Sequence, residues 1–334
     1  MATIAPARSL VAPIVLTRTG TAVLLALATF ALRLPHFGDP SYMIDEQFYL
    51  VAGDRLVHGA LPFVDIWDRK PIGLFLIYAV AALFGAGAVL AYQLMAATAA
   101  AGTAFVITRI ARPIAGAGAG LVAGLLYLLW LELAEGGGGQ APVFYNLLVA
   151  GAAWAVLAAG NTIDRVRHRR LAFAAMALVG IAIQIKYTVV FEGLFFGLTL
   201  SWATLRRMRI GAATIRIGLL AATALVPTGL ALGVYAAIGH GREFWFANFV
   251  SIFQRGPTPG VMIQDRVEMM LILLTPFTLC IAVGLWQSRH RADAAYIRWR
   301  GMMIGWCAAA VIGLFAIGTL YLHYILPVFL PYHP

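Results

Sequence analysis

Residues 33–71 read RLPHFGDPSYMIDEQFYLVAGDRLVHGALPFVDIWDRKP, a polar stretch in a largely apolar chain. Six of the fourteen acidic residues of the protein fall within it: Asp39, Asp45, Glu46, Asp54, Asp65 and Asp68. Charged side chains beside long apolar segments are costly unless they serve a function. A loop that gathers acids at the mouth of membrane helices is therefore a candidate active site.

The composition indicates a helical membrane protein with several spans. The 334 residues are 62% hydrophobic and 11% charged, with a mean hydropathy of +0.86. Lys and Arg number 24 against 14 Asp and Glu. We interpret this excess as arginine in short cytoplasmic loops rather than as a nucleic-acid site. Cys280 and Cys307 lie inside apolar segments, so we expect no disulfide. Four consecutive glycines at 136–139 are the low-complexity segment that stands out.

Apolar stretches predict the helices of the bundle. They cover 19–34, 72–84, 86–108, 115–134, 143–160, 171–185, 187–205, 215–239, 269–287 and 301–320. Stretch 72–84 would reach only about 20 Å as a helix, short of the ~30 Å hydrocarbon core, so we expect a juxtamembrane helix there. The sequence thus predicts an all-α, polytopic bundle of about nine spans. A partial span is expected at 325–330, and the whole of 1–334 is expected to form one domain.

The placement of arginine predicts the orientation. Four short loops are rich in it: Arg109 and Arg112; Arg165, Arg167, Arg169 and Arg170; Arg206, Arg207 and Arg209; Arg289, Arg291, Arg298 and Arg300. Short loops of this kind face the cytoplasm. We therefore expect large outer loops at 35–85 and 240–268, a bacterial inner membrane location, and an active site that faces the periplasm or exterior.

Asp45 and Glu46 lie at the start of a predicted helix. Apolar residues at 44, 48, 51, 52 and 56 have the spacing of an amphipathic helix at the membrane interface. Neighbouring helical side chains point about 100° apart, so at most one of the two carboxylates would face a given substrate. One interpretation makes Asp45 a general base. The other makes both acids first-turn residues that favour the helix dipole, and the sequence leaves both open.

The chain has two lysines, Lys70 and Lys186, against 22 arginines. Lys70 precedes Pro71, which opens an apolar helix, and a helix N-terminus attracts anions such as phosphate. A snorkelling interfacial cation is the alternative. Lys186 interrupts an apolar run, where a charge needs an anionic partner or water. A phosphate or Glu192 would serve, and we favour phosphate.

His323 and Tyr324 form a polar pair near the end of the sequence. The pair either hydrogen-bonds a sugar or phosphate or anchors in the aromatic belt, which we favour. The sequence has no G-x-x-x-x-G-K-[ST] loop, no H-E-x-x-H and no Cys/His cluster of metal spacing. We therefore predict no cofactor and leave a metal requirement open. The polar segments are too short for a nucleotide-binding domain, which favours a donor dissolved in the membrane.

These motifs resemble those of the GT-C superfamily of glycosyltransferases, which use lipid-linked sugars. The likeness is closest to glycosyltransferase family 39 and its bacterial relatives, including protein O-mannosyltransferases, the lipid A aminoarabinose transferase and lipopolysaccharide-core transferases. The following residues and motifs carry it: Arg33 ending the first stretch, Ile44-Asp45-Glu46-x-x-Tyr49, Gly59-x-Leu-Pro-x-x-Asp65-x-x-Asp68-x-Lys70-Pro71, Lys186, and His323-Tyr324-x-Leu-Pro327.

The resemblance implies Asp45 as the catalytic base, with Glu46 beside it, and a lipid phosphate held by Lys70, with Lys186 as a second cation. It also implies a polyprenyl-phosphate sugar donor and inversion at the anomeric carbon. The acceptor would be a hydroxyl of an envelope glycolipid, a polysaccharide or a protein. Further candidate site residues are Tyr49, Asp65, Asp68, Glu135, His323 and Tyr324.

Two features depart from the family pattern. Relatives carry an acid just before the fourth span, where this chain reads Gln140-Ala141-Pro142, so a second acid would come from Glu135 or be absent. Relatives also run longer, so we expect a C-terminally incomplete chain. Two other classes stay open: a transporter or flippase of a lipid-linked or anionic substrate, and a non-catalytic relative. The transporter is disfavoured because the charges cluster at one face and no internal repeat is found.

Overall fold

The computed structural model describes residues 17–254, 256, 259–291, 293–316 and 320–332, and the regular structure in these ranges is helical, without a β-strand. The longer helices are α1 (Arg18–Arg33), α2 (Ile44–Val57), α3 (Ile72–Ala82), α4 (Ala88–Leu133), α5 (Ala141–Gly160), α6 (Arg165–Ile183), α7 (Val189–Leu205), α8 (Ile210–Ala237), α10 (Gly260–Gln287) and α11 (Ala294–Phe315). Short elements connect them: η1 (Leu34–His36), η2 (Gly85–Gly87), α9 (Gly241–Trp245), η3 (Phe246–Val250), η4 (Ser251–Gln254), η5 (Leu322–Ile325) and α12 (Phe329–Tyr332). The predicted all-α, polytopic class is confirmed.

The long element α4 is a helical hairpin. Its backbone reverses at Gly116, whose φ of 90° and ψ of 173° are not helical. Beyond this point the chain folds back on itself. The close approach of the two halves shows this, since a Cβ on Gly124 would lie 2.7 Å from the Thr108 hydroxyl and 2.9 Å from the Ala104 carbonyl oxygen. The stretches predicted at 86–108 and 115–134 are therefore two antiparallel halves that pack through small residues.

The described helices include four that are long and apolar enough to cross a membrane: the Gly85–Leu133 element, α5, α8 and α10. The apolar helices α3 and α7 are shorter. With 11 residues, α3 has the short length expected of a juxtamembrane helix. The number of spans, about nine, stays a prediction.

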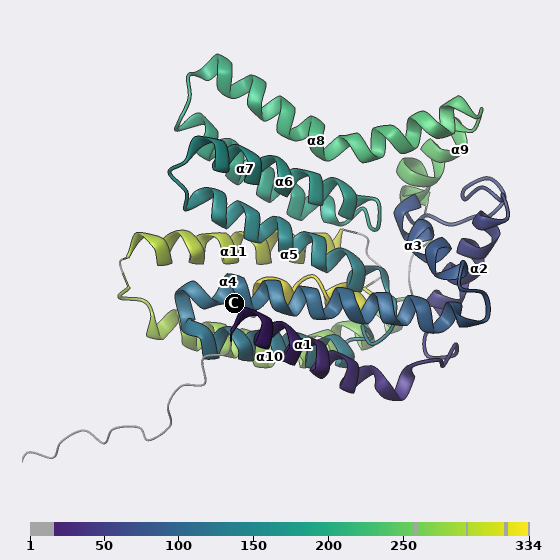
Figure 1. The fold of residues 1–334 in the computed structure, drawn as a ribbon, viewed down its shortest axis with the longest axis horizontal. Coiled ribbons are helices and arrows are strands. Elements are labelled where there is room, and N and C mark those ends of the chain that lie inside the picture. Colours follow the sequence, from purple (N-terminus) through teal and green to yellow (C-terminus); the bar gives the residue numbers. More distant parts are fainter. Residues whose placement is uncertain (1–16, 255, 257–258, 292, 317–319, 333–334) are drawn as a thin grey trace, which may run out of the picture.

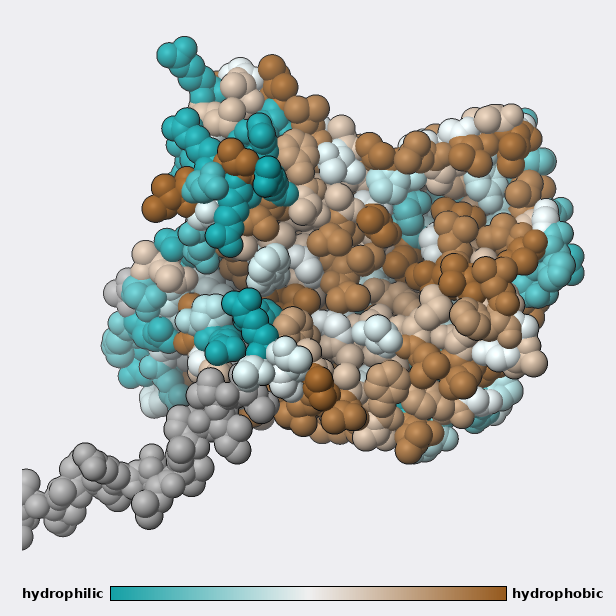
Figure 2. Space-filling view, viewed as in Figure 1, coloured by the Kyte–Doolittle hydropathy of each residue, from teal (hydrophilic) through white to brown (hydrophobic). Residues whose placement is uncertain are grey.

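The two ends of the bundle differ in chemistry. The arginine-rich connections α5–α6, α7–α8 and α10–α11 lie at one end, and α2, α3 and α9 lie at the other (Figure 1). Figure 2 shows a mainly hydrophobic band between hydrophilic ends. Asp164 and Asp293 start helices at the arginine-rich end, because their carboxylates accept hydrogen bonds from the Val166 and Tyr296 backbone N–H groups.

Helix α2 is held against α3 by a close backbone approach. A Cβ on Gly53 would lie 2.5 Å from the Tyr78 carbonyl carbon, so glycine is required there. The predicted apolar face of α2 splits in two. Ala52 packs inward, whereas Ile44 and Val51 are 83% and 60% exposed and available to a membrane interface. This packing fixes the direction in which the first turn of α2 projects its side chains.

The segment predicted as a partial span at 325–330 is not a continuous helix. It consists of η5, a turn and α12, and its residues from Ile325 to Leu330 are buried against the bundle. Pro327 accounts for the break, because proline lacks the N–H that a continuing helix needs. The segment instead brings His323 and Tyr324 under the tip of the α6–α7 connection.

Candidate active site

The candidate site is built on the hydroxyl of Tyr49, which Lys70 and Asp45 both contact. Lys70 donates a hydrogen bond from its ammonium to the Tyr49 hydroxyl at 2.8 Å, and that hydroxyl lies 3.4 Å from the Asp45 carboxylate. Tyr49 is 2% exposed, whereas Asp45 lies at the surface. The ring of Tyr49 therefore holds an acid and a cation, 25 residues apart in sequence, on the same side of α2.

The local sequence explains this arrangement. Asp45 and Tyr49 are four residues apart on α2, so both project from one face. Lys70 precedes Pro71, which caps the start of α3, and α3 packs on α2. No side-chain hydrogen bond caps the first turn of α2. Asp45 therefore makes no capping hydrogen bond at the start of α2. Its charge still lies at the positive end of the helix dipole.

Lys70 remains a cation in this setting. Burial lowers the pKa of Lys70, but its contact with the Tyr49 hydroxyl and the nearby Asp68 carboxylate outweigh this and raise the pKa above its usual value. Asp68 also accepts a hydrogen bond from the Arg69 N–H at 2.5 Å. Asp65 is exposed and accepts a hydrogen bond from the Leu61 N–H at 2.7 Å. Asp65 thus stabilises the backbone of its own loop through the Leu61 N–H, whereas Asp68 is close enough to Lys70 to raise its pKa.

The second lysine arrives from another part of the chain. Lys186 lies at the tip between α6 and α7, and its ammonium is 3.5 Å from the centroid of the Tyr324 ring, a cation–π contact. Tyr324 is also close enough to Lys70 to interact with it electrostatically. Tyr324 therefore contacts Lys186 and interacts electrostatically with Lys70. From the sequence, an aromatic-belt anchor was the favoured interpretation of this tyrosine, and a hydrogen bond to a sugar or phosphate was the alternative.

Glu135 and His323 form a further polar pair next to Tyr324. The His323 Nδ1 lies 3.1 Å from the Glu135 carboxylate. Burial lowers the pKa of His323, so the neutral ring donates its N–H to this carboxylate. The same hydrogen bond holds the pKa of Glu135 below its usual value. Glu135 has a φ of 62°, a backbone region where glycine is usual, so its position at the end of α4 carries strain. The acid suggested for this position by sequence is thus oriented by His323.

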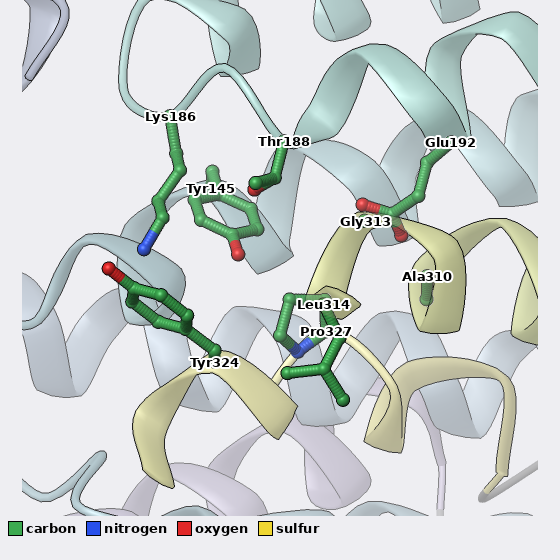
Figure 3. Close-up of a pocket in the computed structure, with 9 residues that line it drawn as sticks. All are labelled: Tyr145, Lys186, Thr188, Glu192, Ala310, Gly313, Leu314, Tyr324 and Pro327. Carbon is green, nitrogen blue, oxygen red and sulfur yellow. The ribbon is translucent and has the colours of Figure 1, made fainter. Parts of the chain in front are cut away.

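A small cavity lies beside the Lys186–Tyr324 pair, which forms part of its lining (Figure 3). Its volume of about 10 Å³ has room for a single water molecule. Tyr145 lines it beside Lys186, and Thr188 and Glu192 line it farther from Lys186. The Glu192 carboxylate accepts a hydrogen bond of 2.7 Å from the Trp306 indole. Glu192 is therefore engaged by α11 and lies across the cavity from the Lys186 ammonium.

Glu46 has surroundings quite different from those of Asp45. It is fully buried, and its carboxylate accepts a hydrogen bond of 2.6 Å from the Gly139 N–H. Burial raises the pKa of Glu46 to about 7, although the hydrogen bonds from Gly139 and Tyr92 oppose the rise. The two adjacent acids of α2 are therefore separated, with Asp45 at the surface and Glu46 directed into the protein.

The glycine run is shaped by the side chains around it. A Cβ on Gly138 would overlap the Glu46 carboxylate, and one on Gly137 would overlap Glu132 and Tyr42. Arg33 donates hydrogen bonds to the carbonyl oxygens of Gly136 and Gly138, and Tyr78 donates one to that of Gly139. Sequence analysis missed this role. The available signal was four glycines in a connection that directly follows an acid.

The buried Glu46 carboxyl is expected to make stability depend on pH. With its pKa raised from 4.5 to about 7, the folded protein keeps a proton between these values that the unfolded chain releases. Stability therefore falls as the pH rises through this window and is constant above it. Thermal unfolding in detergent from pH 5 to 8 should show a Tm that declines by a few degrees for the wild type and is flatter for Glu46→Gln.

The exposed carboxyl of Glu268 supplies the control, because Glu268→Gln removes the same charge from the surface of α10. This variant should follow the wild-type profile. A wild-type Tm that stays level between pH 5 and 7 contradicts the assignment of Glu46 as the titrating group.

The described part of the chain contains no group of three or more His, Cys, Asp or Glu side chains arranged to hold a metal ion. The site is best described as a carboxylate, two ammonium groups and several tyrosines at the mouth of a helical bundle. Such a set can accept a proton and stabilise an anion.

Comparison with known proteins relates this fold to two solved structures. No family model and no curated protein matches the chain. ArnT from Cupriavidus metallidurans bound to undecaprenyl phosphate is similar with a TM-score of 0.63 and 17% identity, over 94% of this chain and 59% of that chain. The Archaeoglobus fulgidus oligosaccharyltransferase complex with zinc and sulfate gives 0.53 and 11%, over 94% and 48%. The chain thus spans less than two thirds of the length of either structure.

Proposed function

We propose that this chain, which has the GT-C fold, is a membrane glycosyltransferase that moves a sugar from a polyprenyl-phosphate donor to a hydroxyl acceptor. One observation carries the proposal: the carboxylate of Asp45 and the ammonium of Lys70 lie against the same Tyr49 hydroxyl, 3.4 and 2.8 Å from it. These contacts hold a carboxylate and an ammonium group together at one end of the bundle, which supports the proposed roles of Asp45 as base and Lys70 as phosphate-binding cation. Transfer from a phosphate-linked sugar needs these two groups.

In the proposed reaction the acceptor hydroxyl gives its proton to Asp45 as its oxygen attacks the anomeric carbon. A new bond forms between this oxygen and the carbon, and the bond from the carbon to the phosphate oxygen breaks. The electron pair of the broken bond stays with the phosphate, which leaves as polyprenyl phosphate. Attack opposite the leaving group inverts the anomeric configuration.

Lys70 and Lys186 would stabilise the charge that develops on the departing phosphate. Lys70 keeps its proton, and Lys186 is 5% exposed and held over Tyr324. Cations fixed in a site with little water stabilise a developing anion more strongly than the same cations in solution. The neutral His323 donates its one N–H to Glu135, so its other ring nitrogen would accept a hydrogen bond from a sugar hydroxyl. Glu46 acts in this proposal as a positioning residue that holds α2 on the glycine run.

The shared fold supports the choice of donor. Of the two similar structures, that of ArnT is bound to undecaprenyl phosphate. The arginine-rich loops support a cytoplasmic face at the opposite end of the bundle from Asp45. The active site would then face the periplasm or exterior of a bacterial inner membrane. The acceptor class, whether envelope glycolipid, polysaccharide or protein, is left to experiment.

A transfer assay tests this function directly. Membranes that contain the chain are mixed with polyprenyl phosphate carrying a radiolabelled sugar, and label is followed into the glycolipid, polysaccharide and protein fractions. The proposal expects label in one fraction, in proportion to the amount of chain. Label that changes leaflet but stays on the lipid indicates a flippase instead. Label that stays in place with the chain present contradicts both activities.

Replacement of Lys70 tests the phosphate contact. Lys70→Gln removes the ammonium but keeps a side chain of similar reach, so transfer should fall by about 10²-fold, the usual cost of losing one preorganised group that stabilises charge. Lys70→Arg keeps the charge and should retain more activity than Lys70→Gln. The matched control is Arg55→Gln, which removes a cation from the exposed side of α2. Equal losses in Lys70→Gln and Arg55→Gln would contradict a specific role for Lys70.

A further inference from the structure

Two cavities lie at the arginine-rich end of the bundle, opposite the candidate active site. One has a volume of about 830 Å³ and the other about 940 Å³. They share four lining residues at the ends of α5, α7 and α11: Gly160, Asn161, Arg207 and Arg298. Together they form a continuous recess between helices, which we call the basic recess. Its position is distinct from the Asp45 site, and its function is independent of the proposed transfer reaction.

Arginine from five helix ends lines the basic recess. The arginines are Arg109, Arg165, Arg167, Arg206, Arg207, Arg216 and Arg298. No aspartate or glutamate is among the described residues that line it. The two acids nearest in sequence, Asp164 and Asp293, are engaged as helix caps by the backbone N–H groups of Val166 and Tyr296. No carboxylate among the described lining residues therefore neutralises the positive charge of the recess.

Part of the wall of the basic recess is apolar and aromatic. Trp154, Phe195, Trp202 and Trp299 line the larger cavity. Trp154 and Trp202 are also 39% and 60% exposed, typical of residues at the depth of lipid headgroups. Arginine at this depth above an apolar wall complements a molecule with a charged head and hydrocarbon chains.

Two polar groups point to a ligand in the recess. The indole N–H of Trp299 is buried and has no hydrogen-bond partner among the described residues. Among the described residues, Arg298 makes one hydrogen-bond contact, a long one of 3.4 Å to the Asn161 side-chain oxygen. An unpaired buried donor costs about 1–3 kcal/mol, and an acceptor brought by a ligand would remove this cost. A phosphate oxygen is the acceptor that arginine binds best, because its fork of N–H groups matches phosphate geometry.

We propose that the basic recess is a binding site for an anionic glycerophospholipid, with the phosphate held by Arg207 and Arg298 and the acyl chains on the Trp154–Trp202 wall. A basic pocket between membrane helices is the usual setting for such a headgroup. The lipid would contact α5, α7 and α11 at once, at the arginine-rich end of the bundle. On the proposed orientation it belongs to the cytoplasmic leaflet.

Native mass spectrometry of the full chain, purified in detergent and mixed with phosphatidylglycerol or phosphatidylcholine, tests the site. The wild type should retain phosphatidylglycerol in preference to phosphatidylcholine. The double variant R207Q/R298Q should bind phosphatidylglycerol at least about tenfold more weakly, since each basic residue near a lipid surface contributes about 1 kcal/mol. The control R289Q/R291Q removes the same charge from the α10–α11 connection outside the recess and should bind within twofold of the wild type.

Four outcomes overturn the proposal. Equal retention of the two lipids by the wild type shows no headgroup site, and equal losses in the two double variants show attraction to net charge alone. Full displacement of phosphatidylglycerol by inorganic phosphate shows a site for a soluble anion. If R207Q/R298Q is not recovered folded, Arg298→Lys and Trp299→Phe carry the same test. Arg298→Lys removes the guanidinium fork but keeps the charge, and Trp299→Phe removes the indole N–H but keeps an aromatic ring. Retention unchanged in both of these variants also contradicts the assignment.

Discussion

Asp45→Asn is expected to lower sugar transfer from a polyprenyl-phosphate donor by about 10²–10⁴-fold, the range usual for loss of a general base. Asparagine has nearly the shape of aspartate and can still accept a hydrogen bond from Tyr49, but it cannot take the proton of the acceptor. Asp45 is exposed and lies outside the core contacts, so the variant should insert and accumulate like the wild type. Initial rates of label transfer in membranes, normalised to protein amount, measure the effect.

A matched carboxylate on the same helix controls for this result. Asp54 is 57% exposed and paired loosely with His58, so Asp54→Asn removes an equal charge without touching the site. Its transfer rate should stay within about twofold of the wild type, as for surface substitutions in general. Unchanged transfer by Asp45→Asn would remove Asp45 as the base. Tyr49→Phe separates catalysis from positioning, since it keeps the base and the cation but frees both from their common hydroxyl.

Arg33→Ala is expected to destabilise the folded protein by about 3–5 kcal/mol, the cost of breaking a buried ion pair on one side. Arg33 is 1% exposed, and its Nε lies 2.9 Å from the Glu132 carboxylate. Its other nitrogens donate to the Gly136 and Gly138 carbonyl oxygens. Alanine would leave an acid and two carbonyl groups without these donors. A large drop in thermal midpoint in detergent, and lower accumulation in membranes, would report the loss.

Two further variants make this prediction specific. Arg18→Ala removes an exposed arginine from the other end of α1 and should change stability by less than about 0.5 kcal/mol. The double variant Arg33→Ala/Glu132→Gln should recover part of the loss, because no charged partner is left behind. Equal midpoints for Arg33→Ala and Arg18→Ala would show that the buried pair does not hold the glycine run in place.

Several parts of the fold were predictable because they depend on local chemistry. Apolar runs of known length predict helices without reference to their neighbours, and stretch 72–84 was too short to span for a reason that involves only the rise per residue. The two halves of the α4 hairpin were predicted as separate apolar stretches, because Arg109 and Arg112 interrupt the apolar run between them. The break at Pro327 was visible in the sequence, yet the apolar residues around it suggested a span.

The candidate site was only partly predictable. Asp45 was selected from the sequence because acids gather in a loop beside apolar helices. Lys70 was selected because it lies at a predicted helix N-terminus, where anions bind. The sequence could not separate Asp45 from Glu46, since both belong to the same first turn. Their difference depends on the glycine run nearly a hundred residues later, against which Glu46 is buried. The role of Arg33 was missed for the same reason, because its partners lie about a hundred residues away.

By itself, the sequence determined that the chain is a helical membrane bundle and which end of it carries the acids and lysines. Hydrophobic transfer and the cost of burying charge act on each segment separately, so both can be read without a fold. Only the tertiary structure decided that Lys70 shares a hydroxyl with Asp45, that Lys186 meets Tyr324, and that Glu46 is directed away from both. These contacts join segments far apart in the chain, and they form only where glycine and alanine let the helices approach closely enough.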